Sequence, residues 1–243
     1  MNNICSLLDI GPDDFTVITG SGGKTHLMHL IAMNLPGNVW LTSTTKVSEK
    51  YEKDFCSCLV KCPYPEKIPE SPPSRLSFFY SNECSGGAKL KGACPHIIAS
   101  ELWKGGKNPV VCEADGSRNL PLKNYSIYDR PLSGFETRHI VCVSVSPLGE
   151  EASQENIHRY MLRPWHGIIG WPMICDMLFS KGGYMDIPLA EKACLVIGGI
   201  NSKIKHEAAV KIASEHKRIY PLGRCLMRGN FYGETEGWWH FYE

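Results

Sequence analysis

The fold of this chain is indicated most clearly by the stretch Phe15-Thr16-Val17-Ile18-Thr19-Gly20-Ser21-Gly22-Gly23-Lys24-Thr25. A short β-branched run comes first, a glycine turn follows, and Lys24-Thr25 open the amphipathic segment Leu27-Met28-His29-Leu30-Ile31. This order predicts a strand, a loop and a helix, which is the layout of a phosphate-binding loop. The competing interpretation is a glycine turn followed by an incidental lysine.

The residues of this loop have separate expected roles. Glycines let backbone N–H groups converge on phosphate oxygens because no Cβ atom intervenes, and the helix N-terminus adds a partial positive charge. We expect Lys24 to contact the terminal phosphates and the Thr25 hydroxyl to bind Mg²⁺. His26 follows in the first helical turn, and its side chain is expected to face outward. The predicted cofactor-binding residues of the loop are Gly20, Ser21, Gly22, Gly23, Lys24, Thr25 and His26.

The spacing of the glycines departs from the usual phosphate-binding loop. That loop has four residues between its first glycine and the Gly-Lys-Thr triplet, but the position five before Gly23 is Ile18. The chain carries the shorter form Gly-x-x-Gly-Lys-Thr. This form resembles the loop of the muramyl ligases, which activate carboxylates with ATP.

Composition predicts a soluble, globular and cytoplasmic protein. The formal net charge is +1, so electrostatics give no reason to expect a nucleic-acid or membrane partner. No apolar run reaches the roughly 18 residues that a membrane helix needs. The first residues lack a basic segment followed by an apolar one, so no secretory leader is expected.

The cysteines leave two interpretations open. Most of the 11 cysteines lie in apolar runs, where they are expected to be small buried hydrophobes. Cys56, Cys58 and Cys62 form a cluster, but the second Cys pair that is typical of structural zinc sites does not follow. The cluster is therefore either a metal site or a set of unmodified thiols.

Strand and helix patterns alternate along the chain, which predicts an α/β fold. We expect a P-loop NTPase-like three-layer sandwich with a mostly parallel central sheet. One nucleotide-binding domain is expected over residues 1–243, with a helical or irregular insertion near residues 150–190. The expected strands are 15–19, 39–41, 75–80, 109–112, 139–145, 193–200 and 218–220, and the expected helices are 24–35, 96–104 and 203–216.

Three polar segments, 20–25, 42–46 and 113–118, each follow a predicted strand. The carboxyl ends of parallel strands meet at one edge of a sheet, so these segments are expected to form a single nucleotide site. The catalytic candidates are Lys24, Glu113 and Asp115. The metal candidates are Thr25, Thr44 and Glu113, since oxygen ligands are those that Mg²⁺ prefers.

Within that site, Asp115 is expected to orient a nucleophile or to bind the second substrate. The alternative is that Asp115 and Gly116 form a tight turn with solvated charges. Arg118 and Lys123 are candidates for offsetting phosphate charge. Lys46 either approaches the phosphates from the second strand or is an ordinary exposed lysine.

The three segments together resemble the YqeC family, whose members are described as selenium-dependent hydroxylase accessory or selenium cofactor biosynthesis proteins. The specific part of the resemblance is Glu113-Ala114-Asp115-Gly116-Ser117-Arg118 followed by Leu120-Pro121-Leu122-Lys123. Weaker similarity extends to Lys89-Leu90-Lys91-Gly92, Pro147-Leu148-Gly149, the segment from His158-Arg159 to Pro164, and the segment from Gly182-Gly183 to Pro188. The resemblance implies a P-loop-type nucleotide binder linked to maturation of selenium-dependent molybdenum hydroxylases.

Two positions depart from the family pattern. A Glu-Pro pair of the family is replaced by Asp129-Arg130-Pro131. The family's Asn-x-x-Asp, similar to a guanine-reading motif, has no aspartate in the segment 200–205 here. ATP is therefore expected in preference to GTP.

Three functions fit these observations. The first is a magnesium-dependent NTPase or phosphotransferase in cofactor assembly, with a selenium-dependent molybdenum hydroxylase or its cofactor as partner. The second is a Mur-ligase-like ATP-dependent ligase, for which 243 residues leave little room for additional substrate domains. The third is a non-enzymatic, nucleotide-dependent chaperone that docks a hydroxylase through Trp165, Trp171 and the Trp238-Trp239 pair.

Overall fold

The computed structural model describes residues 3–62, 64, 67–84, 86–126, 129, 132–188, 190–229 and 238–242. The chain forms two compact units. Unit 1 is built from Met1–Ile18, Lys24–Gly116 and Arg130–His139, and unit 2 from Thr19–Gly23, Ser117–Asp129 and Ile140–Glu243. The expected single-domain organisation stays a prediction.

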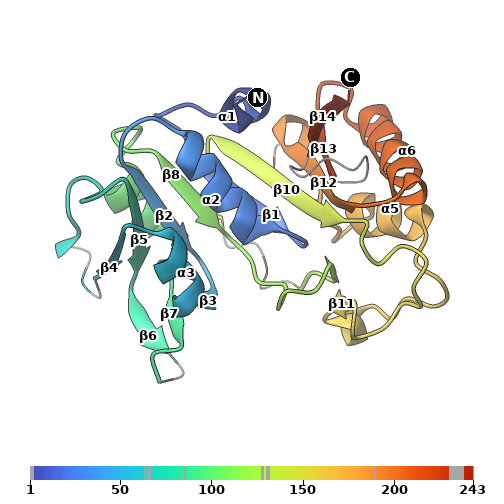
Figure 1. Cartoon of the computed structure of the whole chain (residues 1–243), viewed down its shortest axis with the longest axis horizontal. Coiled ribbons are helices and arrows are strands. Elements are labelled where there is room, and N and C mark those ends of the chain that lie inside the picture. Colours follow the sequence, from blue (N-terminus) through green and yellow to red (C-terminus); the bar gives the residue numbers. More distant parts are fainter. Residues whose placement is uncertain are drawn as a thin grey trace. The chain divides into compact units, whose positions relative to one another are not determined.

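Unit 1 contains five parallel strands in the order β1-β8-β2-β5-β4 (Figure 1). All residues of β1, β2, β5 and β8 are buried, which explains why these strands are continuous apolar runs in the sequence. The strands are β1 (Phe15–Gly20), whose last two residues belong to unit 2, β2 (Val39–Ser43), β4 (Cys58–Lys61), β5 (Leu76–Tyr80) and β8 (Val110–Glu113).

Helices cover both faces of these strands. Successive side chains of a strand point to opposite faces, so one face of β1, β2 and β8 presents Phe15, Trp40 and Val110. These three residues share a core cluster with Ile98 and Leu102 of the π-helix η2 (Ile98–Trp103), which continues α4 (Pro95–Ile97). Helix α2 (Lys24–Asn34) packs on β8 and β2, and α1 (Ile4–Leu8) contacts α2.

A small antiparallel sheet completes unit 1. Its strand order is β3-β7-β6, and α3 (Glu49–Phe55) follows β3 directly. The strands are β3 (Lys46–Ser48), β6 (Asn82–Cys84) and β7 (Lys89–Lys91).

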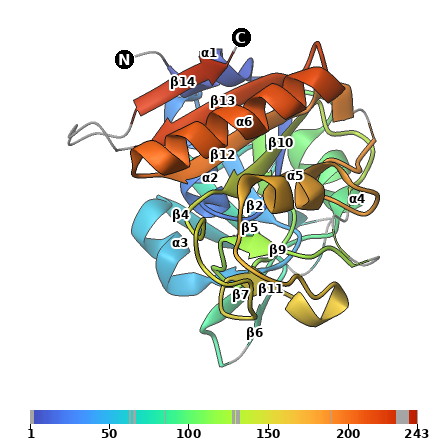
Figure 2. The ribbon, with the colours of Figure 1, turned by 90° about the vertical axis from the view of Figure 1, so that its right-hand side faces the viewer.

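Unit 2 has three parallel strands, β10-β12-β13, and β14 pairs antiparallel with β13. Helix α6 packs against β12, β13 and α5 (Figure 2). The elements are β10 (Arg138–Ser144), whose first two residues belong to unit 1, α5 (Trp171–Phe179), β12 (Cys194–Ile200), α6 (Lys203–Ile219), β13 (Arg224–Gly229) and β14 (Trp238–Tyr242). Between β10 and α5, the short strand β11 (Ile157–His158) pairs in parallel with β9 (Leu122–Lys123), and the turns η3 (Tyr160–Leu162) and η4 (Ala190–Lys192) are 3-10 helices.

The expected α/β fold with mostly parallel strands is confirmed, and one predicted strand is wrong. Residues 218 and 219 end α6, and the strand begins at Arg224 instead. The helix continues because its apolar stripe Ala209, Ile212 and Ala213 is followed by His216, which is also buried. Pro221 cannot continue the helix and precedes the turn to β13.

All eleven cysteines are free thiols. None of the helices in the described ranges combines the length and the apolarity that a bilayer crossing requires.

The imidazole ring of His216 is buried inside unit 2. Its side chain is 0% exposed, and neither ring nitrogen has a hydrogen-bond partner in the described part of the chain. Its ring lies 5.4 Å from that of Tyr220 and 6.2 Å from that of Phe179, between ring centroids. Burial, aided by the charge of Lys217, lowers its pKa to about 4.

We therefore expect unit 2 to lose stability in mild acid. An unfolded histidine binds its proton near pH 6.5, whereas His216 in the fold binds one only near pH 4. Between these values unfolding takes up a proton, so the free energy of unfolding falls as the pH drops, by up to about 3 kcal/mol. His216→Leu should flatten this dependence in urea unfolding between pH 7 and pH 4.5.

His216→Leu should reduce the slope of the unfolding free energy against pH without abolishing it. The pKa of His158 is also lowered to about 4, by burial and by the charges of Lys123, Arg159 and Arg118, so His158 contributes in the same pH range. An unchanged slope in His216→Leu would contradict the assignment.

Candidate functional site

The N-terminus of α2 and the carboxyl ends of β8 and β2 meet inside unit 1. Strand β8 lies between β1 and β2, and Glu113 is in register with Ile18 on one side and with Ser43 on the other. Lys24 and Thr25 are the first two residues of α2. Of the segments 20–25, 42–46 and 113–118 that were expected to form one site, the parts Lys24–Thr25, Ser43–Thr45 and Glu113–Asp115 lie within this unit, and a single nucleotide site stays a prediction.

Lys24 lies between two buried carboxylates. Its Nζ is 3.6 Å from Glu113 Oε1 and 3.4 Å from Asp115 Oδ1. Lys24, Glu113 and Asp115 are 4%, 7% and 1% exposed. A buried ammonium needs compensating charge, and two carboxylates at nearly equal distances supply it. We call Lys24, Thr25, Glu113 and Asp115 the lysine–carboxylate cluster.

Thr25 completes this cluster from the next position of α2. Its Oγ1 donates a hydrogen bond of 2.6 Å to Glu113 Oε2. The pKa of Glu113 is raised, chiefly by burial and further by the charges of Asp115 and Glu52, while Lys24 and the Thr25 hydrogen bond oppose the shift. Glu113 thus uses one oxygen toward the lysine and the other toward the hydroxyl.

The hydroxyl-rich end of β2 holds the chain around Glu113 in place. Ser43 Oγ donates to the Glu113 carbonyl oxygen at 2.8 Å, and the Thr44 N–H donates to the same oxygen at 3.0 Å. Thr44 Oγ1 donates to the Ala114 carbonyl oxygen at 2.6 Å. Thr44, an expected metal ligand, therefore lies beside the cluster with its hydroxyl proton bonded to the main chain.

Gly92 lies against this segment, which gives one of the weaker sequence similarities a physical reason. A Cβ atom on Gly92 would lie 1.4 Å from the Ser43 carbonyl oxygen. The close approach allows Gly92 N–H to donate to Thr45 O at 3.1 Å and Ala93 N–H to donate to Ser43 O at 3.0 Å. No role for Gly92 was predicted from the sequence. The position of this glycine directly after Lys89-Leu90-Lys91 was the one sequence feature that could have indicated it.

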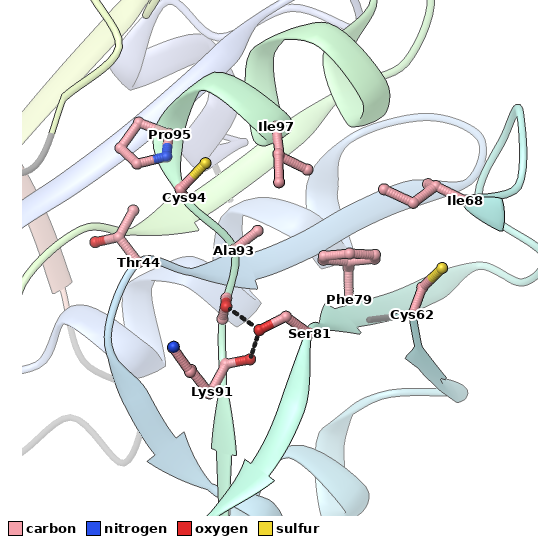
Figure 3. Close-up of a pocket in the computed structure, with 11 residues that line it drawn as sticks. Thr44, Cys62, Ile68, Phe79, Ser81, Lys91, Ala93, Cys94, Pro95 and Ile97 are labelled. Atoms are coloured by element: carbon pink, nitrogen blue, oxygen red, sulfur yellow. Dashed lines mark hydrogen bonds between the residues drawn. The ribbon is translucent and has the colours of Figure 1, made fainter. Parts of the chain in front are cut away.

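A cavity of about 350 Å³ opens next to Thr44 (Figure 3). Most of its wall is apolar, and Ser81 and Lys91 are its polar members apart from Thr44. Ser81 Oγ is tied to the main chain, since it donates to the Lys91 and Gly92 carbonyl oxygens. The apolar wall is formed by Cys62, Ile68, Phe79, Ala93, Cys94, Pro95 and Ile97.

The glycine turn that precedes Lys24 in the chain belongs to unit 2. Gly20, Gly22 and Gly23 all have positive φ angles, of 98°, 81° and 96°. A Cβ on Gly20 would lie 2.0 Å from the Cys142 carbonyl oxygen, whereas a Cβ on Gly23 would meet nothing within 4 Å. Gly20 is thus required by close packing, whereas at position 23 only the positive φ angle favours glycine.

Ser21 makes hydrogen bonds within unit 2 through its main-chain N–H and its side-chain hydroxyl. Its N–H donates to Cys142 O at 3.0 Å, and its hydroxyl lies 2.7 Å from both the Pro121 carbonyl oxygen and the Tyr184 hydroxyl. The Tyr184 hydroxyl in turn accepts the N–H of Lys123 at 2.7 Å. Ser21 therefore fixes the turn, and sequence reasoning missed Tyr184 because it lies 163 residues away in the chain.

Lys123 is buried in unit 2 with an acidic partner. Its Nζ lies 3.1 Å from Asp129 Oδ1 and 4.4 Å from the centroid of the Tyr125 ring. Asp129 also pairs with Arg159, and its pKa is lowered by the Ser126 N–H and by both cations, although burial opposes this. An acid is thus present where the family pattern has Glu-Pro, and it is paired with both cations, while Arg130 and Pro131 lie outside the described residues.

Three further cofactor-binding candidates have exposed side chains. His26 is exposed on α2, as expected, and Lys46 is exposed at the start of β3, in register with Lys91. Arg118 is exposed and has a left-handed backbone, with φ of 52°. Their roles in ligand binding stay predictions.

The fold and the site define an α/β protein in which a glycine turn leads into a buried lysine–carboxylate cluster. A model of the YqeC family, described as YqeC protein, matches residues 16–161, which include the whole cluster. The match covers more than half of the chain, so the chain belongs to the YqeC family.

A curated relative supports this assignment. A protein of Escherichia coli (strain K12), named "Uncharacterized protein YqeC", is 26% identical over 144 residues. The matched region covers 59% of this chain and 56% of that protein, so the chain spans about half of the relative's length. No solved structure is significantly similar to the chain.

Removal of the Lys24 charge should destabilise unit 1. Lys24→Met leaves two buried carboxylates without their cation, and breaking a buried pair in this way costs about 3–5 kcal/mol. Adding Glu113→Gln to this variant should restore part of the loss, because one buried charge is gone. Urea unfolding of Lys24→Met, Glu113→Gln and the double variant measures the coupling between Lys24 and Glu113. If the stability loss of the double variant equals the sum of the two single losses, the two groups are not coupled.

Gly92→Ala should strain the end of β2. The new methyl would overlap the Ser43 carbonyl oxygen, so the backbone must shift at a cost of about 1–3 kcal/mol. Gly11→Ala is the matched control, because its Cβ would meet only Asp14 Oδ2, at 3.7 Å, and Gly11 has no positive φ. Thermal unfolding should show a lower midpoint for Gly92→Ala alone, and equal midpoints would refute the close approach.

Proposed function

We propose that this chain binds a nucleoside triphosphate, ATP in preference to GTP, together with Mg²⁺, and that it is a P-loop NTPase-like phosphotransferase or hydrolase. The observation that carries the proposal is the buried lysine–carboxylate cluster at the start of the helix that follows a glycine turn. The family resemblance extends the proposal to cytoplasmic maturation of selenium-dependent molybdenum hydroxylases. In that role, the hydroxylase or its cofactor is the partner.

The main-chain donors of the turn support phosphate binding. Among the described residues, the N–H groups of Gly22 and Gly23 donate to no protein acceptor. Positive φ at successive glycines turns such N–H groups toward one point, which makes a concave anion site. Lys24 follows in the chain and brings an ammonium group, and the α2 N-terminus adds its partial charge.

The donor set fits Mg²⁺. Thr25 Oγ1 and Glu113 Oε2 are both hard oxygen donors, and they lie 2.6 Å apart. Adjacent oxygen ligands of an octahedral Mg²⁺ site are about 2.9 Å apart, so a small adjustment is enough. Thr25 and Glu113 would hold the ion, with Thr44 next to them. When bound, Mg²⁺ neutralises charge on the transferring phosphoryl group.

The ion pairs suggest what Lys24 does before and during binding. Lys24 pairs with both Glu113 and Asp115 and offsets one of their two charges, so its ammonium is already positioned and desolvated. A triphosphate competes with the carboxylates for this ammonium, and the shift leaves Glu113 and Asp115 available as bases or ligands. Phosphoryl transfer depends mainly on such positioning and charge stabilisation. Asp115 is the group assigned to orient the acceptor.

The cavity beside Thr44 is the proposed place for the acceptor. Its apolar wall suits a substrate with an apolar body, and Lys91 suits one with an anionic end. Thr44 borders both the cavity and the main chain of Glu113 and Ala114, so an acceptor there would lie next to the cluster.

Isothermal titration of ATP and GTP, with and without Mg²⁺, tests the nucleotide. Lys24→Met should weaken ATP binding about 100-fold, since a hydrogen bond to a charged group contributes roughly 1.5–3 kcal/mol. Glu113→Gln should remove the gain in affinity that Mg²⁺ provides. Lys50→Met is the matched control, because Lys50 is exposed and lies outside the cluster. Unchanged affinity in a folded Lys24→Met variant would end the proposal.

The same preparations separate the enzymatic and non-enzymatic alternatives. Phosphate or ADP release supports an enzyme, and release that requires both a carboxylate and an amine would support a ligase. Tight binding without turnover would favour a chaperone. For that function, Trp165 and Trp171 are only partly available, since both pack against the core of unit 2, and the side chains of Trp238 and Trp239 lie outside the described residues.

The selenium link needs a cellular test. Deletion of the gene should abolish selenium-dependent hydroxylase activity while the apoenzyme is still made. Hydroxylase activity that persists in the deletion strain would remove this part of the proposal and leave nucleotide binding untouched.

A further inference from the structure

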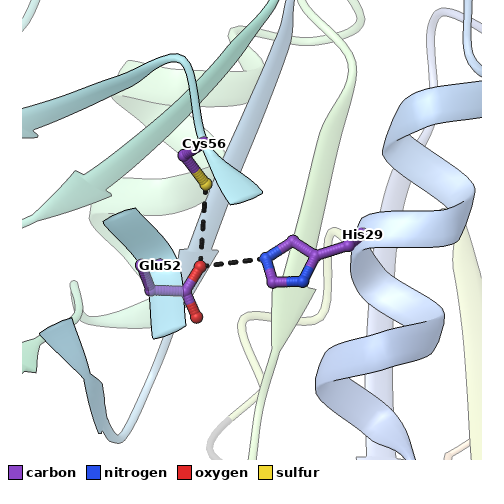
Figure 4. A group of neighbouring side chains, drawn as sticks. All are labelled: His29, Glu52 and Cys56. Atoms are coloured by element: carbon purple, nitrogen blue, oxygen red, sulfur yellow. Dashed lines mark hydrogen bonds and ion pairs between the residues drawn. The ribbon is translucent and has the colours of Figure 1, made fainter. Parts of the chain in front are cut away.

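A second cluster of ligand-type side chains lies further along α2 in unit 1. His29 comes from α2, Glu52 from α3, and Cys56 from the residue that caps the C-terminus of α3 (Figure 4). Glu52 and Cys56 are four residues apart, so they lie on the same face of the helix. No motif in the sequence joins these three residues, because His29 is 23 positions from Glu52.

The three donor atoms already have separations close to those around a bound metal ion. His29 Nε2 is 3.0 Å from Glu52 Oε2, Cys56 Sγ is 3.7 Å from the same oxygen, and all three atoms lie within 4.8 Å of one another. Metal–ligand bonds of 2.0–2.3 Å in a tetrahedral site place neighbouring donors about 3.3–3.6 Å apart. Small side-chain adjustments would therefore close the group around one ion.

The Glu52 carboxylate is buried with one of its two oxygens unpartnered among the described residues, which is a separate indication of a bound ion. Its carboxylate is 0% exposed, and its Oε1 has no hydrogen-bond partner in the described part of the chain. A buried carboxylate without full compensation is costly, and buried charges are normally paired or coordinate metals. His29 is 1% exposed, and its ring is stacked on Phe55 at 4.5 Å between centroids, which fixes the imidazole plane.

The kind of ion follows from the donors. A nitrogen, an oxygen and a sulfur donor together suit a borderline-soft ion such as Zn²⁺, whereas Mg²⁺ and Ca²⁺ take oxygen. A carboxylate and a thiolate carry two negative charges, which a dication neutralises. Three protein donors also leave a fourth position, for water or for Glu52 Oε1.

We propose that His29 Nε2, Glu52 Oε2 and Cys56 Sγ form a binding site for a zinc-class dication. The site replaces the metal interpretation of the cluster Cys56, Cys58 and Cys62. Cys62 donates its thiol to the Tyr64 carbonyl oxygen at 2.9 Å, and Cys58 lies in β4. Among the described residues, His29, Glu52 and Cys56 are the group whose donor atoms have the spacing of metal ligands.

The test is metal binding by the purified full chain, in excess Mg²⁺ and without nucleotide. Zn²⁺ should bind with one ion per chain and raise the thermal midpoint, and Co²⁺ should give the charge-transfer band of a single thiolate ligand. Cys56→Ser should remove that band and weaken Zn²⁺ binding at least about 100-fold, since loss of a mere supporting group already costs 10–100-fold. Glu52→Gln, which keeps the side-chain volume, should weaken it as well.

Cys58→Ser is the matched control, because Cys58 is also half-buried, lies two residues further on and is outside the site. It should keep the band and the affinity. Sub-stoichiometric binding in the wild type, or equal losses in Cys58→Ser and Cys56→Ser, would overturn the proposal. If Cys56→Ser does not fold, Glu52→Gln takes its place. A weaker charge-transfer band and weaker Zn²⁺ binding in Glu52→Gln support the proposal, and an unchanged band and affinity overturn it. Zinc binding retained in Lys24→Met separates this test from the nucleotide proposal.

Discussion

The ion pairs of Lys24 with Glu113 and Asp115 are the constraint around which unit 1 is arranged. Burying two ionised carboxylates at and just after the end of β8 is costly unless a cation pairs with them. Lys24, which opens α2, provides a cation to both, so α2 has to begin close to the end of β1. The connection has only three residues, Ser21–Gly23, and the positive φ angles of Gly22 and Gly23 make it possible. The fold and the candidate site therefore both require a short, glycine-rich connection in the segment 20–25.

This arrangement explains which parts of the fold could be predicted. The buried parallel strands are continuous apolar runs, such as Val110–Cys112, so their positions follow from the sequence alone. The meeting of Lys24, Thr25 and Glu113 also followed, because parallel strands present their carboxyl ends on one edge. Short polar elements could not be found in this way. Strands β3 and β7 have one buried residue each, which is too little for a periodic signal.

Other features were out of reach because they depend on tertiary contacts. The Ser21–Tyr184 hydrogen bond joins residues from distant segments, and no local pattern marks either residue for it. The strand predicted at Arg218–Tyr220 failed since a short run of β-forming residues cannot reveal that the helix before it has not ended. His29 looked like one more position on an amphipathic helix, and only the packing of α3 shows that a carboxylate faces it.

Helix α2 links the two clusters of unit 1. Lys24 and Thr25 begin the helix, and His29 follows little more than one turn later. The charge of Glu52 is among the causes that raise the pKa of Glu113, so the two buried acids influence each other through the protein interior. A dication held by Glu52 would cancel that repulsion and favour the ionised form of Glu113. Ionised Glu113 is the form that would hold Mg²⁺ beside Thr25, so the charge at Glu52 bears on the proposed magnesium site as well as on the proposed zinc site.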